Sequence, residues 1–162
     1  MPAMNNLFDT LDLNATKPFK PRSINQSLTR QLFTNLPDSV KQVGLNLLNQ
    51  HGYRFYAVDQ SRGACYWTKH VITIPSWIWN SQSVERTHPG AALLNYRCWY
   101  VCHEMAHALE HINSNGLQYD NRPHGPRFMN ELRAICPSDC ILYELGYKPR
   151  NAQHLLTELL GF

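Results

Sequence analysis

The sequence predicts a small α+β domain in which several helices pack against one three-stranded sheet. Three short segments rich in aromatic and β-branched residues, 53–58, 64–68 and 71–74, are separated by turn-forming residues and indicate strands. The segments on either side of them carry apolar residues at helical spacing. The chain has 162 residues, of which 43% are apolar, enough for a single compact domain with its own core.

The N-terminal part combines a tail with two helices. Asn, Pro and Lys residues interrupt residues 1–22, so we expect a flexible tail there, followed by a single domain over residues 23–162. Residues 24–35 and 38–50 have the apolar spacing of helices. Gly52 follows the second helix and is expected to end it.

The three strand segments are expected to form a small sheet of mixed or antiparallel strands, and the simplest arrangement is a meander. Two turns separate them, at residues 59–63 and 69–70. Pro75 closes the third strand, because proline cannot donate to a strand ladder. Residues 76–90 are predicted as a short helical turn followed by a loop.

A long helix is predicted over residues 91–112, because this stretch contains neither Pro nor Gly. A loop follows up to Gly125, and Pro126 opens the next helix, where its missing N–H has no intrahelical partner. This helix is expected to end at Pro137. Two further short helices are predicted at residues 138–145 and 151–160.

The charge and composition of the chain limit the kinds of partner and the cellular compartment that we expect for it. The net charge is +3 and the pI is near 8.6, which is well short of a dedicated nucleic-acid binder. The N-terminus lacks the basic flank and apolar run of a signal peptide, and no apolar run approaches the roughly 20 residues of a membrane span. We therefore expect a cytoplasmic protein with no membrane partner, whose five cysteines are reduced.

The chemistry of the chain is concentrated in the string CHEMAHALEH within the long predicted helix. His103 and His107 are four positions apart, so both imidazoles project from one helix face and can bind one metal ion. Glu104 is rotated by about 100 degrees from His103, which places its carboxylate beside the metal. There it can act as general base toward a water that a zinc ion has made acidic.

A catalytic zinc ion needs a third protein ligand and an open position for water. Glu110 and His111 lie about 10 and 12 Å beyond His103 along the same helix, too far to share its ion easily. His124 lies after a loop that can turn the chain back, directly before the next helix, and is the favoured ligand. Asp120 in the same loop is the weaker alternative.

The two motifs HEMAHAL and HGPRFMNEL resemble those of the SprT-like zinc metallopeptidases, the family that includes the Spartan protease domain. The matching residues are His103, Glu104 and His107, followed by the third histidine in an HGxxF segment at 124–128. The resemblance covers roughly residues 38–136. It implies a zincin-like fold, in which a small sheet packs against the HExxH helix and a substrate groove runs beside an edge strand. It also implies one catalytic zinc ion and cleavage of proteins, often DNA-associated ones.

The chain departs from this family in one respect. Many SprT-like proteins carry paired CxxC motifs of a zinc ribbon after the catalytic domain, and this sequence has no such pairs. We therefore expect a protein or peptide substrate and at most weak association with DNA.

Other residues have less certain roles. The oxyanion of a tetrahedral intermediate could be stabilised by Tyr119, Arg122 or Arg127, and the sequence does not choose among them. His111 could face the substrate or support a ligand, or be an exposed residue at the helix end. Four of the five cysteines are expected to be core thiols, with a four-cysteine zinc site as the alternative. These four are Cys98, Cys102, Cys136 and Cys140.

The sequence thus predicts a zinc-dependent metallopeptidase with Glu104 as general base. Two alternatives remain, a non-catalytic zinc-stabilised module that binds DNA or protein, and an enzyme that hydrolyses a non-peptide amide. Glu104 favours catalysis, because a purely structural zinc site does not need that carboxylate.

Overall fold

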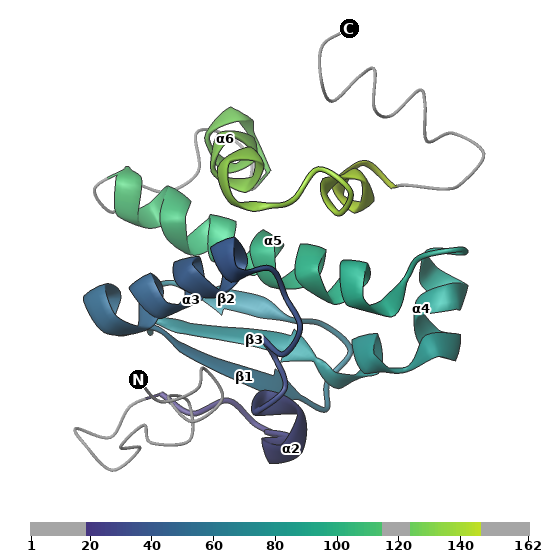
Figure 1. Ribbon diagram of the computed structural model, residues 1–162. Coiled ribbons are helices and arrows are strands. Elements are labelled where there is room, and N and C mark those ends of the chain that lie inside the picture. Colours follow the sequence, from purple (N-terminus) through teal and green to yellow (C-terminus); the bar gives the residue numbers. More distant parts are fainter. Residues whose placement is uncertain (1–18, 115–123, 147–162) are drawn as a thin grey trace, which may run out of the picture.

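The computed structural model describes residues 19–114 and 124–146 (Figure 1). Residues 1–18 of the expected tail lie outside this part, as does the helix expected at residues 151–160. The described chain is an α+β fold with one three-stranded mixed sheet and several helices, which confirms the predicted class.

The sheet contains β1 (Arg54–Val58), β2 (Ala64–Tyr66) and β3 (Val71–Pro75), in the order β1-β3-β2. Strand β3 is parallel to β1 and antiparallel to β2. The expected meander is therefore wrong, since it would put β2 in the middle. The physical reason is burial: all five residues of β3 are buried and require neighbours on both edges, whereas β2 is only partly buried.

Two long helices occupy the layer next to the sheet, α3 (Asp38–His51) and α5 (Leu93–Asn113). Both were predicted to within a few residues. Helix α3 follows Pro37 and ends at Gly52, which has a left-handed backbone with φ of 68°. Glycine adopts this conformation without the steric penalty of a Cβ atom.

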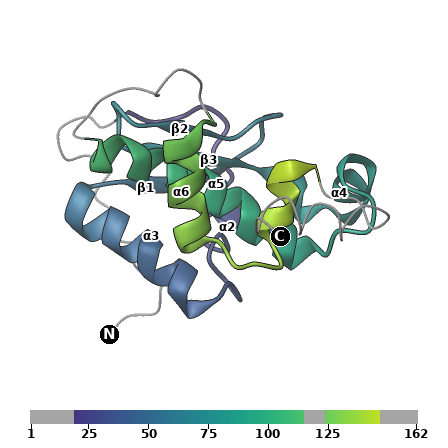
Figure 2. The same ribbon diagram turned by 90° about the horizontal axis from the view of Figure 1, so that it is seen from above.

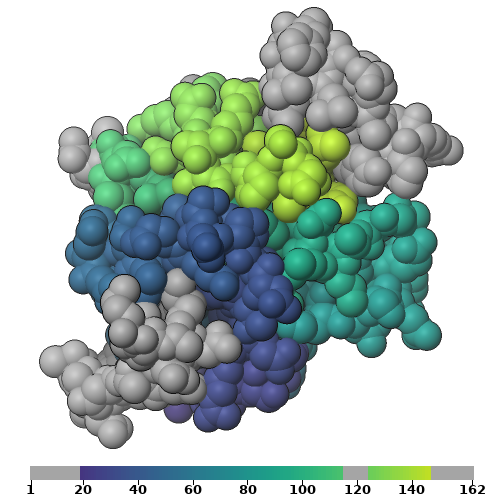
Figure 3. Space-filling model, in the orientation of Figure 1, coloured from purple at the N-terminus to yellow at the C-terminus, as the bar shows by residue number. Residues whose placement is uncertain are grey.

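A further layer lies above α5 and is formed by α6 (Pro126–Ile135) and the 3-10 helix η2 (Ile141–Leu145). Seen from above, α6 crosses α5 (Figure 2). In the space-filling view, residues 124–146 in green and yellow cover the upper side of the molecule (Figure 3). Of the helix expected at residues 138–145, only the 3-10 turn at its end is formed.

One other predicted helix differs from the structure. The segment expected to be one helix over residues 24–35 contains only a four-residue helix, α2 (Gln26–Thr29). Its continuation follows tighter turns, in which Leu32 N–H donates to Thr29 O and Leu36 N–H to Phe33 O. These turns bury Leu32, Phe33 and Leu36 in the core, so tertiary packing outweighs the local helical spacing.

Residues 76–90 begin with the expected short helical turn, but the part expected to be a loop contains a helix. The segment contains the 3-10 helix η1 (Ser76–Trp79) and the helix α4 (Ser81–Thr87). Asn80 caps α4, because its side-chain oxygen accepts a hydrogen bond of 2.9 Å from Ser83 N–H. This cap explains why a polar segment forms a helix here.

Residues just before α2 run along the sheet. Ile24 forms a bridge with Val58, and Gln60 Nε2 donates to Arg22 O at 2.8 Å. Phe19 packs against Tyr66 with ring centroids 5.2 Å apart. The tail boundary expected at residue 22 remains a prediction, since most of the tail lies outside the described residues. Within the described residues, no helix has the length and apolar character needed to cross a membrane.

The turn before β2 is held closely against the rest of the fold at Gly63. Its N–H donates to the Tyr100 hydroxyl at 3.0 Å, and a Cβ atom at this position would lie 2.3 Å from Thr73 O. The clash would be with main chain, which cannot move aside as a flexible side chain can. Gly63 thus fixes the distance between this turn and α5.

We expect Gly63→Ala to lower the free energy of unfolding by about 1–3 kcal/mol, because the added methyl group overpacks this contact. Urea denaturation would measure the change. Ser61→Ala, an exposed residue of the same turn, is the matched control and should stay within about 0.5 kcal/mol of the parent protein. Equal stability of both variants would show that the turn can move freely.

Candidate metal centre

Three histidines from two helices meet at one point. His103 and His107 lie one turn apart on α5, and His124 directly precedes Gly125, the N-cap of α6. The three ring centroids are each 5.0 Å from the other two. The structure therefore brings together the three residues that were predicted from the sequence as ligands.

The distances between the ring nitrogens fit a single ion. The potential ligand atoms of His103, His107 and His124 all lie within 4.8 Å of one another. Nε2 of His124 is 3.3 Å from Nε2 of His103. Tetrahedral imidazole ligands with metal–nitrogen bonds of about 2.0–2.1 Å would have their nitrogens about 3.3 Å apart. The three side chains are thus close enough to hold one metal ion.

Phe128 forms the floor beneath the three rings. It is the third residue of α6, it is fully buried, and its ring centroid lies 5.0, 4.5 and 4.9 Å from those of His103, His107 and His124. A rigid aromatic floor restricts the rotamers of all three imidazoles. The position of Phe128 on α6 thus links the motif on α5 to the motif at the start of α6.

Glu144 is a site residue that the sequence analysis missed. Its Oε2 lies 2.9 Å from Nδ1 of His103 and accepts a second hydrogen bond, of 3.2 Å, from Nε1 of Trp99. An Nδ1–H bond to a carboxylate leaves Nε2 of His103 as the ligand atom and fixes the orientation of the ring. Glu144 lies 41 residues beyond His103 in a short apolar helix, where no sequence pattern marks it.

The electrostatics of the rings suit metal binding. Burial and the neighbouring His103 and His124 lower the pKa of His107 to about 3. Burial and His103 likewise lower the pKa of His124. These two rings therefore favour the neutral form, which is the form that binds metal. Burial alone would lower the pKa of His103, but the hydrogen bond to Glu144 and its charge outweigh burial and raise it.

Glu104 lies beside the three rings and is not one of the converging ligands. Its Oε1 is 3.8 Å from Nε2 of His103, and the residue is only 5% exposed. Burial raises the pKa of Glu104 to about 7; the positive charge of His103 opposes this increase, and the charge of Glu144 adds to it. A carboxylate with a pKa near neutrality can both accept and donate a proton at physiological pH. A cation bound nearby would lower this pKa.

A cavity of about 590 Å³ opens over these residues. One wall is the turn and strand segment 61–65, which leads into β2. The opposite wall contains the three histidines and Glu104, and the aromatic residues Trp77, Tyr96 and Tyr100 complete the lining. The candidate metal position therefore faces a space large enough for part of a peptide.

The other candidate residues lie elsewhere or outside the described chain. Nε of Arg127 is 3.8 Å from Oε2 of Glu110, and His111 stacks on Trp67 with ring centroids 4.4 Å apart. Neither Arg127 nor His111 lines the cavity above the histidines. The remaining candidates lie outside the described residues. They are Tyr119, Asp120 and Arg122.

We expect Glu144→Ala to weaken metal binding by about 10- to 100-fold, because His103 loses the group that orients its ring. Glu144→Gln should have a smaller effect, since the amide oxygen can still accept from Nδ1–H. Competition with a chromophoric chelator would measure the affinity. Glu85→Ala, which removes an exposed glutamate on α4, is the control and should leave it unchanged.

His124→Ala should greatly reduce the metal that is bound at the histidines, because two imidazoles on one helix remain as the only protein ligands. Metal analysis of the purified variant beside the parent protein would test this. Undiminished metal at this site would reassign the third ligand, and Asp120→Ala would then be the next variant to analyse.

No protein-family model, no curated protein and no solved structure matches this chain. The likeness to SprT-like metallopeptidases thus remains a prediction from the two motifs. What the geometry adds is a cluster of three histidines able to hold a metal ion, with a buried carboxylate beside it and a cavity above it.

Proposed function

We propose that this protein is a zinc-dependent peptidase, with His103, His107 and His124 as ligands and Glu104 as general base. The observation that carries the proposal is the position of the Glu104 carboxylate. It is buried, lies 3.8 Å from the ring of His103, and lines an open cavity. A site that only stabilises the fold is normally closed by a fourth protein ligand.

Zinc is the ion that this donor set favours. Three imidazoles whose ring nitrogens lie within 4.8 Å of one another, with one side open to a cavity, are typical of catalytic zinc sites. A zinc ion held in this way supplies a Lewis acid and lowers the pKa of water to about 7.

The residues of the chain supply the proton transfers. Glu104 accepts a proton from the attacking water and donates it to the leaving amine, and its burial opposes the lowering of its pKa by the bound cation. Glu144 keeps His103 in the tautomer whose Nε2 faces the cavity. Phe128 and the helix α5 keep these groups from rotating out of position.

A peptide is favoured over a small amide because the cavity borders an edge of the sheet. Within the described residues, β2 pairs only with β3, so its other edge can pair with an extended chain. Addition of a strand at such an edge is a common way of binding peptides. The motif resemblance further suggests DNA-associated proteins as substrates, which the assay below can test.

Glu104→Gln should lower the rate of hydrolysis by about 10²- to 10⁴-fold, the usual contribution of a general acid–base group. The assay would follow cleavage of denatured casein by the zinc-loaded protein, with and without single-stranded DNA. Because Glu104 is not a ligand, metal content should equal that of the parent protein.

The control for folding is the thermal unfolding curve of the same variant, which should remain close to that of the parent. Full hydrolytic activity in Glu104→Gln would overturn the proposed mechanism. A parent protein that binds zinc and cleaves nothing, with or without DNA, would instead favour a binding module.

A further inference from the structure

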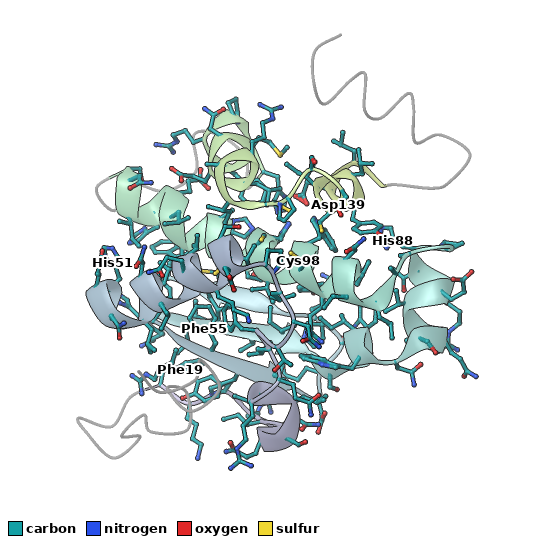
Figure 4. All side chains as sticks on the ribbon, in the orientation of Figure 1. Phe19, His51, Phe55, His88, Cys98 and Asp139 are labelled. Carbon is teal, nitrogen blue, oxygen red and sulfur yellow. The ribbon has the colours of Figure 1, made fainter. Side chains whose placement is uncertain are left out.

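Four cysteines that the proposed reaction does not use lie where α5 faces the connection between α6 and η2. Cys98 and Cys102 are one turn apart on α5, and Cys136 and Cys140 flank the connection between α6 and η2. All four are buried, with exposed fractions between 0% and 7%. Figure 4 labels Cys98 and the neighbouring Asp139 on these two facing segments.

The thiols are neighbours across the two segments, because Cys98 influences the pKa of Cys102 and of Cys140, and Cys136 that of Cys102. The sulfur of Cys102 also lies 3.9 Å from the carbonyl oxygen of Ile135, the residue before Cys136. The four thiols therefore lie in the order Cys136, Cys102, Cys98, Cys140. Sequence spacing alone would not bring the two pairs together, since Cys136 lies 34 residues beyond Cys102 and only Cys98 and Cys102 share a helix.

We propose that Cys98, Cys102, Cys136 and Cys140 form a second, structural metal site that holds one zinc ion through four thiolates. Sets of four cysteines are the commonest closed zinc sites, and soft thiolate ligands select zinc over magnesium or calcium. On binding, each thiol that is protonated loses its proton to solvent as its sulfur becomes a ligand.

The four sulfurs must rearrange to close the proposed site. Among the described residues, only the three histidines have ligand atoms that all lie within 4.8 Å of one another, so the sulfurs form an open chain. Tetrahedral zinc–sulfur bonds of about 2.3 Å would place the sulfurs about 3.8 Å apart. One χ1 rotation moves a cysteine sulfur by about 3 Å, which is enough to bring the ends of the chain inward.

The surroundings partly compensate the charge of such a site. Arg97 is close enough for its guanidinium to favour the thiolate of Cys98 electrostatically. The thiols of Cys102 and Cys140 hydrogen-bond to that sulfur and lower the pKa of Cys98, whereas neighbouring thiols and burial raise the pKa of Cys102 and Cys140. Metal binding would have to displace the protons of these two thiols. Asp139 opposes the thiolate, and Cys140 Sγ lies 3.5 Å from its Oδ1, a contact that the metal bond would replace.

The proposed ion would fasten the last described segment to α5. Cys102 immediately precedes His103, and Cys140 is four residues before Glu144. His103 and Glu144 are joined by a hydrogen bond. A metal that joins the two thiol pairs would therefore fix the distance between these two groups as well. The site does not depend on the proposed peptidase activity, because its own metal content can be measured.

Metal analysis and native mass spectrometry of the full zinc-loaded chain would test the proposal. We expect two zinc ions per chain, and one in each of two double variants, His103→Ala/His107→Ala and Cys98→Ser/Cys140→Ser. Cys65→Ser, which removes the fifth thiol, should keep two. A parent chain whose zinc content is unchanged in Cys98→Ser/Cys140→Ser, or intact masses showing two disulfides, would overturn the proposal.

Cobalt binding provides a readout that does not require the cysteine variant to fold. In the His103→Ala/His107→Ala protein, Co²⁺ should produce the intense near-ultraviolet charge-transfer band of thiolate ligands, and its absence would count against the site. The outcomes distinguish a failure of the proposed peptidase activity from a failure of the proposed cysteine site. Two zinc ions without hydrolysis would contradict the peptidase alone, and one histidine-bound zinc ion with hydrolysis would contradict the cysteine site alone.

Discussion

The contact between α5 and α6 is the constraint on which the candidate site depends. Two imidazoles come from α5 and the third from the residue before α6, so a shift of either helix would separate the nitrogens. The buried ring of Phe128 sets their spacing, because it touches all three imidazoles and is itself held in the core. The tight packing of protein interiors makes such a spacer stiff.

The same arrangement separates the chemical roles of two carboxylates. Glu104 and Glu144 both lie near His103, yet only Glu144 is within hydrogen-bonding distance of its ring, at 2.9 Å from Nδ1. The carboxylate of Glu144 thus accepts hydrogen bonds from the imidazole of His103 and the indole of Trp99. Glu104 remains buried, and its pKa is raised. Different surroundings thus give two residues of one type different properties: one carboxylate orients a ring, and the other has a pKa near neutrality.

Much of this site could be predicted from sequence because it depends on local spacing. His103 and His107 share a helix face by helical periodicity, and His124 was favoured because a loop returns the chain before Pro126. Glu144 could not be found in this way, since its role arises only from the folding of a distant segment onto α5. The strand order failed for a similar reason: burial of β3 on both sides is a property of the assembled layers.

The position of Glu144 has a consequence for biosynthesis. The ribosome releases the chain from its N-terminus, so both imidazoles of α5 emerge some forty residues before the carboxylate that orients one of them. A nascent chain that ends within α6 has its three histidines but lacks this anchor. The hydrogen bond that orients His103 can therefore form only after the segment that follows α6 has been synthesised and has folded onto α5.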